Sequence, residues 1–320
     1  MPAPDRGGPS MLHVRVIAPE RVSARVRQWL TGDEAVTHLV VLPGAAKAPR
    51  GDVVEFDVVR EGASHVLDGL RELGLDRDGA IIVDHVDTAL SASADRAARR
   101  TPGLGVDAVV WHEIESQTGE EAALSASFLT FMSVATVIAA IGVLLDQPIL
   151  IVGSMVVGPE FGPLAALCVG LVQRKIALVR HSALALAVGF PVGMIVTVVA
   201  VWLLTAAGLV DKSMLLEARP LTDFIWRPDA LSWVIGFLGG IAGILSLTSA
   251  KAGTLVGVLI SVTTVPAAAN AAVALAYGVR EEAYGSALQL AINLAAIVLG
   301  GVLTLLVQQL AWRRPRRRVR

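Results

Sequence analysis

The sequence predicts an α-helical polytopic membrane protein that is preceded by a small α+β domain. Hydrophobic residues make up 54% of the 320 residues. Charged residues are dense up to about Glu121 and sparse from there to Leu310, and arginines dominate beyond that point. Two apolar stretches, 149–172 and 253–277, are long enough to cross a bilayer but are interrupted by Gly, Pro and polar residues. This pattern predicts a polar domain, a membrane domain with two broken spans, and a basic tail.

The first ten residues, MPAPDRGGPS, contain no apolar run of the kind that a signal peptide requires. We therefore expect residues 1–10 to be disordered. We also expect the domain that follows to remain on the side of the membrane where it is made.

Residues 11–94 predict a cytoplasmic ferredoxin-like domain with the element order βαββαβ. Apolar and β-branched runs predict strands at 12–17, 36–42, 52–59 and 80–86. A first helix is predicted over 19–30, and Ser64 is expected to cap a second helix that Gly74 ends. The turn-rich segment 43–51 separates the two middle strands. Because this fold hosts many functions, it predicts no activity by itself.

No metal or cofactor site is predicted. The histidines of the first domain are scattered, and the segment HEIE at 112–115 lacks a second histidine on the same helix face. Asp84 and Asp87, which flank His85, are interpreted as ordinary solvated carboxylates. The scattered histidines are His13, His38, His65 and His85.

The sequence also argues against an enzyme. The predicted spans contain no nucleophile with a base, no phosphate-binding loop and no metal-ligand spacing. The single cysteine, Cys168, excludes a disulfide framework and is interpreted as a small packed residue.

Residues 95–123 are predicted to connect the two domains. The segment 95–100 is charged, 101–105 is a Gly/Pro breaker, and 106–123 is compatible with a helix. Trp111 suits the headgroup boundary, which predicts an interfacial helix. A plain connector helix fits the same residues.

Six spans are predicted within residues 124–310, each long enough for a hydrocarbon core of about 30 Å. With the first domain inside, the inner connections and the tail carry ten Lys and Arg residues, against four outside. This asymmetry predicts a multi-pass protein of the cell (plasma) membrane with both termini in the cytoplasm. The spans are 124–145, 149–172, 180–209, 230–249, 253–277 and 284–310.

Six spans can be divided into two groups of three, which is the arithmetic of a possible 3+3 inverted repeat. Each broken span is then the second of its group, with interruptions at 153–163 and 261–270. In this interpretation Pro159 and Pro266 lie at similar depths.

Glu160 is the most informative candidate residue, because an ionisable carboxylate near the centre of a span costs about 3 kcal/mol and normally faces a cavity or partner. It is predicted to bind a cation or to carry a proton. No arginine or lysine lies deep in any predicted span to neutralise it. The alternative is a protonated or hydrated glutamate in a bent segment.

Neutral groups complete the candidate substrate- or ion-binding site. Pro159, Pro163 and Pro266 interrupt helical hydrogen bonding and free nearby backbone groups. Side-chain oxygens come from both broken spans and the sixth span, and hydrogen bonding between helices is the alternative role for each. Ser154 is the weakest, because serine in a span often bonds its own backbone. The others are Thr263, Thr264, Asn270, Asn293 and Gln289.

Glycines of the fourth span and arginines of the tail suggest further contacts. Gly236, Gly239, Gly240 and Gly243 form small-xxx-small patterns that predict a close approach to a neighbouring helix. The basic cytoplasmic tail, residues 311–320, is predicted to attract anionic membrane lipids. It lacks aromatic interleaving and a folded scaffold, so nucleic acid is not expected as a partner.

In five motifs the chain resembles the DUF389 family, domain-of-unknown-function 389 membrane proteins. These are IGVLLDQP at 141–148, VGSMVVGP at 152–159, Gly162-Pro163, Val265-Pro266 and NLAAI at 293–297. The resemblance covers about residues 125–310 and implies a polytopic membrane protein without an established activity. Glu160 departs from the family pattern, in which the residue after the Pro159 equivalent tends to be apolar or proline.

The sequence as a whole predicts a transporter or channel for an ion or small polar solute, with a binding site between the two broken spans. The first domain then acts as a regulatory domain, and a homo-oligomer is expected. The alternative is a membrane sensor or scaffold that does not transport, whose first domain binds a metabolite or protein.

Overall fold

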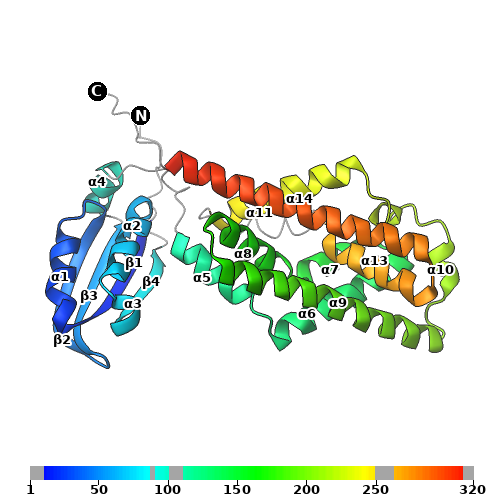
Figure 1. The fold of residues 1–320 in the computed structure, drawn as a ribbon, viewed down its shortest axis with the longest axis horizontal. Helices are drawn as coiled ribbons and strands as arrows, with labels where there is room; N and C mark the ends of the chain where they lie inside the picture. The colour runs from blue at the N-terminus through cyan, green and yellow to red at the C-terminus, as the bar shows by residue number, and fades with distance from the viewer. Residues whose placement is uncertain (1–10, 87–90, 101–110, 249–262, 313–320) are drawn as a thin grey trace. The chain divides into compact units, whose positions relative to one another are not determined.

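The computed structural model describes residues 11–86, 91–100, 111–248 and 263–312 (Figure 1). Predictions for the N-terminal residues 1–10, for the tail from 313 and for the first half of the fifth span therefore lie outside the described residues. The chain divides into two compact units, which we describe separately. The N-terminal unit is built on Met1–Glu113, and the helical unit on Ile114–Leu247 and Lys251–Val307.

The N-terminal unit contains a four-stranded antiparallel sheet with the strand order β2-β3-β1-β4. Its element order agrees with the predicted βαββαβ, with one additional helical turn, α3 (Leu75–Asp78). The strands are β1 (Met11–Pro19), β2 (Val36–Lys47), β3 (Arg50–Val59) and β4 (Ala80–Val86), and the main helices are α1 (Glu20–Thr31) and α2 (Arg60–Glu72).

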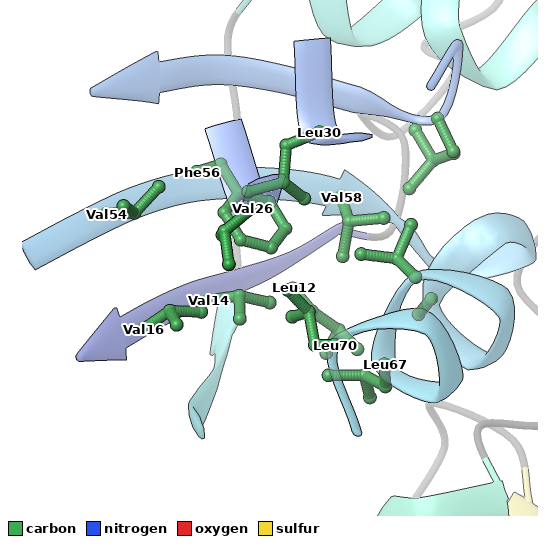
Figure 2. Close-up of a cluster of buried hydrophobic side chains, with 14 of the residues drawn as sticks. Leu12, Val14, Val16, Val26, Leu30, Val54, Phe56, Val58, Leu67 and Leu70 are labelled. Atoms are coloured by element: carbon green, nitrogen blue, oxygen red, sulfur yellow. The ribbon is translucent and has the colours of Figure 1, made fainter. Parts of the chain in front are cut away.

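The core of this unit lies between the sheet and the helices α1 and α2. Val14 and Val16 of β1 are buried while Arg15 between them is exposed, because successive side chains of a strand point to opposite faces. Figure 2 shows Phe56 of β3 in the middle of this cluster, with Val26 of α1 beside it. The buried side of the sheet, formed by every second strand residue, thus packs against the apolar faces of both helices.

Two local predictions are wrong. The segment 43–51 does not separate the middle strands, because β2 and β3 extend through most of it. β2 is an edge strand with two register shifts, where Pro43 costs no ladder hydrogen bond. Ser64 does not cap α2, which already begins after the extended residue Val59. The end of α2 is as predicted, since Gly74 takes the left-handed conformation with φ of 81°.

The connection between the units contains two helices in the described residues. α4 (Ala92–Arg100) includes the charged segment that we predicted as linker, and α5 (Trp111–Glu121) lies within the predicted interfacial segment. Ala94 and Ala97 of α4 are buried in the core cluster of the N-terminal unit. The small apolar side chains therefore give this charged helix a packed face.

The helical unit has the apolar helices of a membrane-embedded protein. Four helices are long and apolar enough to cross a bilayer: α6 (Ala126–Leu144), α9 (Ile176–Ala206), α11 (Ala230–Thr248) and α14 (Arg280–Trp312). The pair α7 (Pro148–Val157) and α8 (Phe161–Val172) is bent by 53° at a short break and makes a fifth candidate.

The count of six spans stays a prediction. α13 (Thr264–Tyr277), the described half of the predicted fifth span, has 14 residues and is too short to cross a bilayer by itself. The described residues thus account for four or five spans. The predicted interruption of the second span is present as the bend between α7 and α8, which forms either one broken span or a re-entrant loop.

Aspartates accept hydrogen bonds at the starts of α10 (Lys212–Leu216) and α11. Asp211 accepts hydrogen bonds from the amides of Ser213 and Met214 at the start of α10. The hydroxyl and amide of Ser232 donate to Asp229 just before α11, both at 2.7 Å. These donors hold the pKa of each carboxyl below its ordinary value, because they stabilise the charged form.

Glycines allow α11 and α14 to touch along their backbones. A Cβ atom added at Gly240 would lie 2.2 Å from the carbonyl oxygen of Ile297, and one at Gly300 would lie 2.2 Å from that of Phe237. Gly236 faces Ala296 in the same contact. The close approach predicted for Gly236 and Gly240 is therefore confirmed.

Replacing Phe56 with Ala should destabilise the N-terminal unit by about 3–5 kcal/mol, because this fully buried ring leaves a cavity between the sheet and the helices. Pulse proteolysis of the full-length protein in urea, following the N-terminal fragment, measures the change. Val40→Ala is the matched control, because Val40 is 46% exposed. Equal effects of the two substitutions would contradict this account of the core.

Replacing Gly240 with Ala should lower the thermal stability of the detergent-solubilised protein by about 1–3 kcal/mol, because the new methyl group must push α11 away from α14. Gly153→Ala in α7 is the matched control, since a Cβ atom there meets nothing within 4 Å. Both substitutions gain the same helix propensity. A higher midpoint temperature for Gly240→Ala than for Gly153→Ala would refute the backbone contact.

Candidate functional site

The break between α7 and α8 carries Glu160. α7 ends at Val157, Gly158 is extended, and Glu160 is the residue that precedes the first turn of α8. A Cβ atom added at Gly158 would lie 2.4 Å from Glu160 Oε2 and 2.9 Å from Val265 Cγ2. The glycine therefore leaves the space in which the Glu160 carboxylate lies against the start of α13.

The Glu160 carboxylate is buried and only half satisfied. Glu160 is only 5% exposed. Thr264 at the start of α13 donates its hydroxyl to Glu160 Oε1 at 2.8 Å, whereas Oε2 has no hydrogen-bond partner among the described residues. The break between α7 and α8 and the start of α13 therefore meet at this carboxylate.

The two half-helices begin in the same way. Pro163 is the third residue of α8, and Pro266 is the third residue of α13. Proline has no N–H, and the third position of a helix has no intrahelical acceptor for one. The structure thus pairs Pro266 with Pro163 by helix position, whereas our interpretation paired it with Pro159, which lies in the break.

Thr263 and Asn293 extend this site toward a cavity. Asn293 of α14 donates its amide to Thr263 Oγ1 at 2.9 Å and to the Thr263 carbonyl at 3.3 Å. Both residues line a cavity of about 230 Å³ between α7, α11, α14 and the residues before η2 (Asp223–Ile225). The volume is enough for several water molecules or a small solute. Glu160 does not line this cavity. Its hydrogen-bond partner Thr264, however, is the chain neighbour of Thr263, which does.

Polar side chains continue along one face of α14. Glu282, Ser286, Gln289 and Asn293 are spaced by four, three and four residues, and each is at most 5% exposed. This spacing places them on one face of the helix. Together with Asn270 of α13 and Thr263, which directly precedes α13, we call them the polar seam; Gln289 Oε1 has no partner among the described residues.

A buried ion pair forms the far end of the polar seam. Arg219, in the connection between α10 and η2, donates to Glu282 and, at 3.3 Å, to Asn270 Oδ1. The Asn270 amide donates to Glu282 Oε1 at 3.0 Å and to Ser286 Oγ at 2.7 Å. Arg219 and Glu282 are each 5% exposed. We predicted Asn270 as a ligand beside Glu160, but it lies in this separate cluster.

The sequence analysis missed this ion pair. Arg219 and Glu282 were assigned to connections outside the spans, where charged residues are normally solvated. The available signal was the spacing of polar residues from Glu282 to Asn293, which has helical periodicity. Nothing in the sequence indicates that Arg219 folds back onto this face.

Ser154 behaves as expected for the weakest candidate. Its hydroxyl donates to the Ile151 carbonyl of its own helix at 2.6 Å. The structure therefore brings together Glu160, Thr263, Thr264 and Asn293 of the predicted side chains, framed by the three prolines.

Two histidines of the N-terminal unit meet at one carboxylate. Cross-strand pairing places His13 opposite Asp57, and the Nδ1 atoms of His13 and His38 lie 2.8 and 2.6 Å from the two Asp57 oxygens. His38 sits at a register shift of β2 with φ of 52°, and its Nε2 lies 2.8 Å from the hydroxyls of Ser91 and Ser93. The interpretation of these two histidines as scattered is wrong.

This cluster connects the sheet to the start of α4. A serine, a histidine and a carboxylate in contact with one another also occur in nucleophilic catalysis. None of these residues lines the cavity beside Asn293, which lies in the helical unit. Among the described residues, no group of three His, Cys, Asp or Glu side chains is arranged to hold a metal ion.

Comparison with known proteins agrees with the motifs found in the sequence. Residues 155–299 match the family model described as Domain of unknown function (DUF389). An uncharacterised protein of Methanocaldococcus jannaschii, MJ0678, is 25% identical over 194 residues, which cover 61% of this chain and 58% of the relative. No solved structure matches the chain.

The matched region begins within α7 and ends within α14, so it contains Glu160, α8, α13 and the whole polar seam. The expected resemblance is thereby confirmed over residues 155–299, where the chain matches the DUF389 family model, while the motif at 141–148 precedes the match.

Proposed function

We propose that the helical unit conducts an ion or small polar solute across the cell membrane, through a site between the α7–α8 break and α13. The observation that carries this proposal is a buried line of polar groups in an otherwise apolar unit. It includes the polar seam and continues from Asn293 through Thr263 and Thr264 to Glu160.

The energetics favour a functional role for this line. Polar groups in the hydrocarbon region are expensive and mark solute pathways when they face the interior of a bundle. Glu282 to Asn293 spans eleven residues of α14, or about 16 Å at 1.5 Å per residue. This is about half the thickness of the hydrocarbon core. Packing alone would be served as well by apolar side chains of similar size.

The cavity beside Asn293 provides the place where a solute first meets the line. Its lining combines apolar side chains such as Ile151 and Ile235 with the polar groups of Thr263, Ser232 and Asn293. A concave, mostly apolar pocket with a few convergent polar groups is typical of small-molecule sites.

The remaining parts of the proposal concern orientation and regulation. With ten Lys and Arg residues on the inner connections and tail, the N-terminal unit lies in the cytoplasm and regulates passage. The apolar helices carry large exposed side chains, such as Ile195 at 63% and Leu203 at 66%, which suit lipid or further copies in a homo-oligomer.

Replacing Thr263 with Val, or Asn293 with Leu, should reduce solute flux about tenfold, because loss of one buried hydrogen-bonding group costs about 1.4 kcal/mol. Swelling of proteoliposomes under osmotic gradients of a panel of salts and neutral solutes measures the flux. Thr130→Val is the matched control, since the exposed Thr130 hydroxyl bonds only the Ala126 carbonyl of its own helix. A wild-type protein that passes none of the solutes would favour the sensor or scaffold.

Replacing Arg219 with Ala should destabilise the detergent-solubilised protein by about 3–5 kcal/mol, because Glu282 is left as a buried charge without its cation. Thermal unfolding measures the change. Arg227→Ala is the control: this arginine pairs with Asp223 at 3.1 Å but its side chain is 63% exposed, so about 0–1 kcal/mol is expected. The double variant Arg219→Met/Glu282→Gln should recover part of the loss. Additive losses in the double variant would show that the two residues do not interact.

A further inference from the structure

Glu160 lacks a cationic partner among the described residues, although it is only 5% exposed. The other buried carboxylate of the helical unit, Glu282, is neutralised by Arg219. A buried charge without compensation is strongly destabilising. The Glu160 carboxyl is therefore either protonated or held as an anion by another positive potential.

Two helix N-termini supply that potential. Glu160 directly precedes the 12-residue α8, and its Oε1 is bonded by the first residue of the 14-residue α13, Thr264. Each helix N-terminus acts as about half a positive charge, so two together compensate about one carboxylate. The first-turn amides of Phe161 and Gly162, and of Thr264 and Val265, have no acceptor within their own helices.

The unpartnered oxygen points into this same place. Glu160 Oε2 lies beside Gly158 and the Val265 side chain in the first turn of α13. The nearby carboxylate of Glu121 faces Gly162 of α8, but Glu121 is exposed to solvent. Glu160 is thus the buried carboxyl group of this site, and its Oε2 has no hydrogen-bond partner among the described residues.

We propose that the converging N-termini of α8 and α13 form a binding site for a small monovalent anion, and that the Glu160 side chain occupies this site as a tethered competitor. The inference rests on the proposed function and names its substrate class. It replaces the cation that the sequence predicted, because two positive helix ends repel a cation and attract an anion.

The geometry also indicates how the competitor is released. A solute anion in the cavity meets Thr263 and Asn293, and the next residue, Thr264, holds Glu160 Oε1. An anion that takes over the Thr264 hydroxyl displaces the carboxylate and connects the cavity with the break. Glu160 then acts as a gate whose closed state is the one described here.

The test compares Glu160→Ala, which empties the site, with Glu160→Gln, which fills it with a neutral group of the same shape. The full-length variants are purified in detergent in a chloride-free buffer, and formate and chloride are added as sodium salts. Glu160→Ala should show a saturable rise in midpoint temperature with both anions. In Glu160→Gln and in wild type the apparent affinity should be at least about tenfold lower, because an occupant of the site competes with the anion.

Thr264→Val provides a second variant in case Glu160→Ala does not fold. It removes the hydroxyl that the anion takes over from Glu160, so the weak anion response of wild type should be lost, and an unchanged response would contradict the site. A sodium or potassium ion that stabilises wild type, with loss of the effect in Glu160→Gln, would overturn the inference in favour of a cation ligand. Folded Glu160→Ala that is insensitive to formate and chloride would overturn it as well.

Flux separates this inference from the proposed function. In proteoliposomes, Glu160→Ala should pass chloride and formate several times faster than wild type, with no change for neutral solutes. Anion binding to Glu160→Ala without flux of any solute would support the anion site and refute passage. Flux of solutes in wild type with no anion effect in any variant would support passage and refute the tethered competitor.

Discussion

Backbone groups that leave helical hydrogen bonding inside a membrane must be satisfied within the protein, and this constraint organises the helical unit. The chain interrupts one span at Gly158 and Glu160 and begins a second half-helix at Thr264. Prolines at the third position of both half-helices reduce the number of free amides. The remaining positive ends then hold the Glu160 carboxylate, which itself cannot be exposed to lipid.

Close packing elsewhere makes this arrangement precise. The backbone contacts at Gly240 and Gly300 keep α14 against α11. α14 can then present its polar face to α13 along a fixed line, because rigid helices position side chains better than loops do. Close packing at the crossing and the polar contacts therefore follow one another along one face of α14, because Ile297 and Gly300 continue the helical spacing of Gln289 and Asn293. The first gives the rigidity on which the second depends.

The two buried carboxylates illustrate different ways to place a charge in an apolar unit. Glu282 has a guanidinium and an amide as direct partners, so its pairing resembles a structural lock. Glu160 has a single hydroxyl and two helix ends. A neutral hydroxyl holds a carboxylate less tightly than the charge-assisted hydrogen bond of an arginine does, and a mobile carboxylate is what the proposed gate requires. The difference in compensation therefore suggests a difference in role.

The N-terminal unit follows simpler rules. Alternating apolar side chains on the strands and an apolar face on each helix produce its core, with Phe56 at the centre. Its less predictable feature is the meeting of His13 and His38 at Asp57, which ties the start of α4 to the sheet. Such a tie holds the start of α4 against the sheet within this unit.

Local patterns in the sequence determined the elements. Strand alternation, helix-ending Gly74, the apolar spans and the break beside Glu160 were all readable, because each depends on residues within a few positions of one another. Only the tertiary structure decided which charges meet: Arg219 reaches Glu282 across 63 positions, and Thr264 reaches Glu160 across 104. It also decided that the starts of α8 and α13 both lie beside Glu160, because residues 104 positions apart meet only in the folded chain.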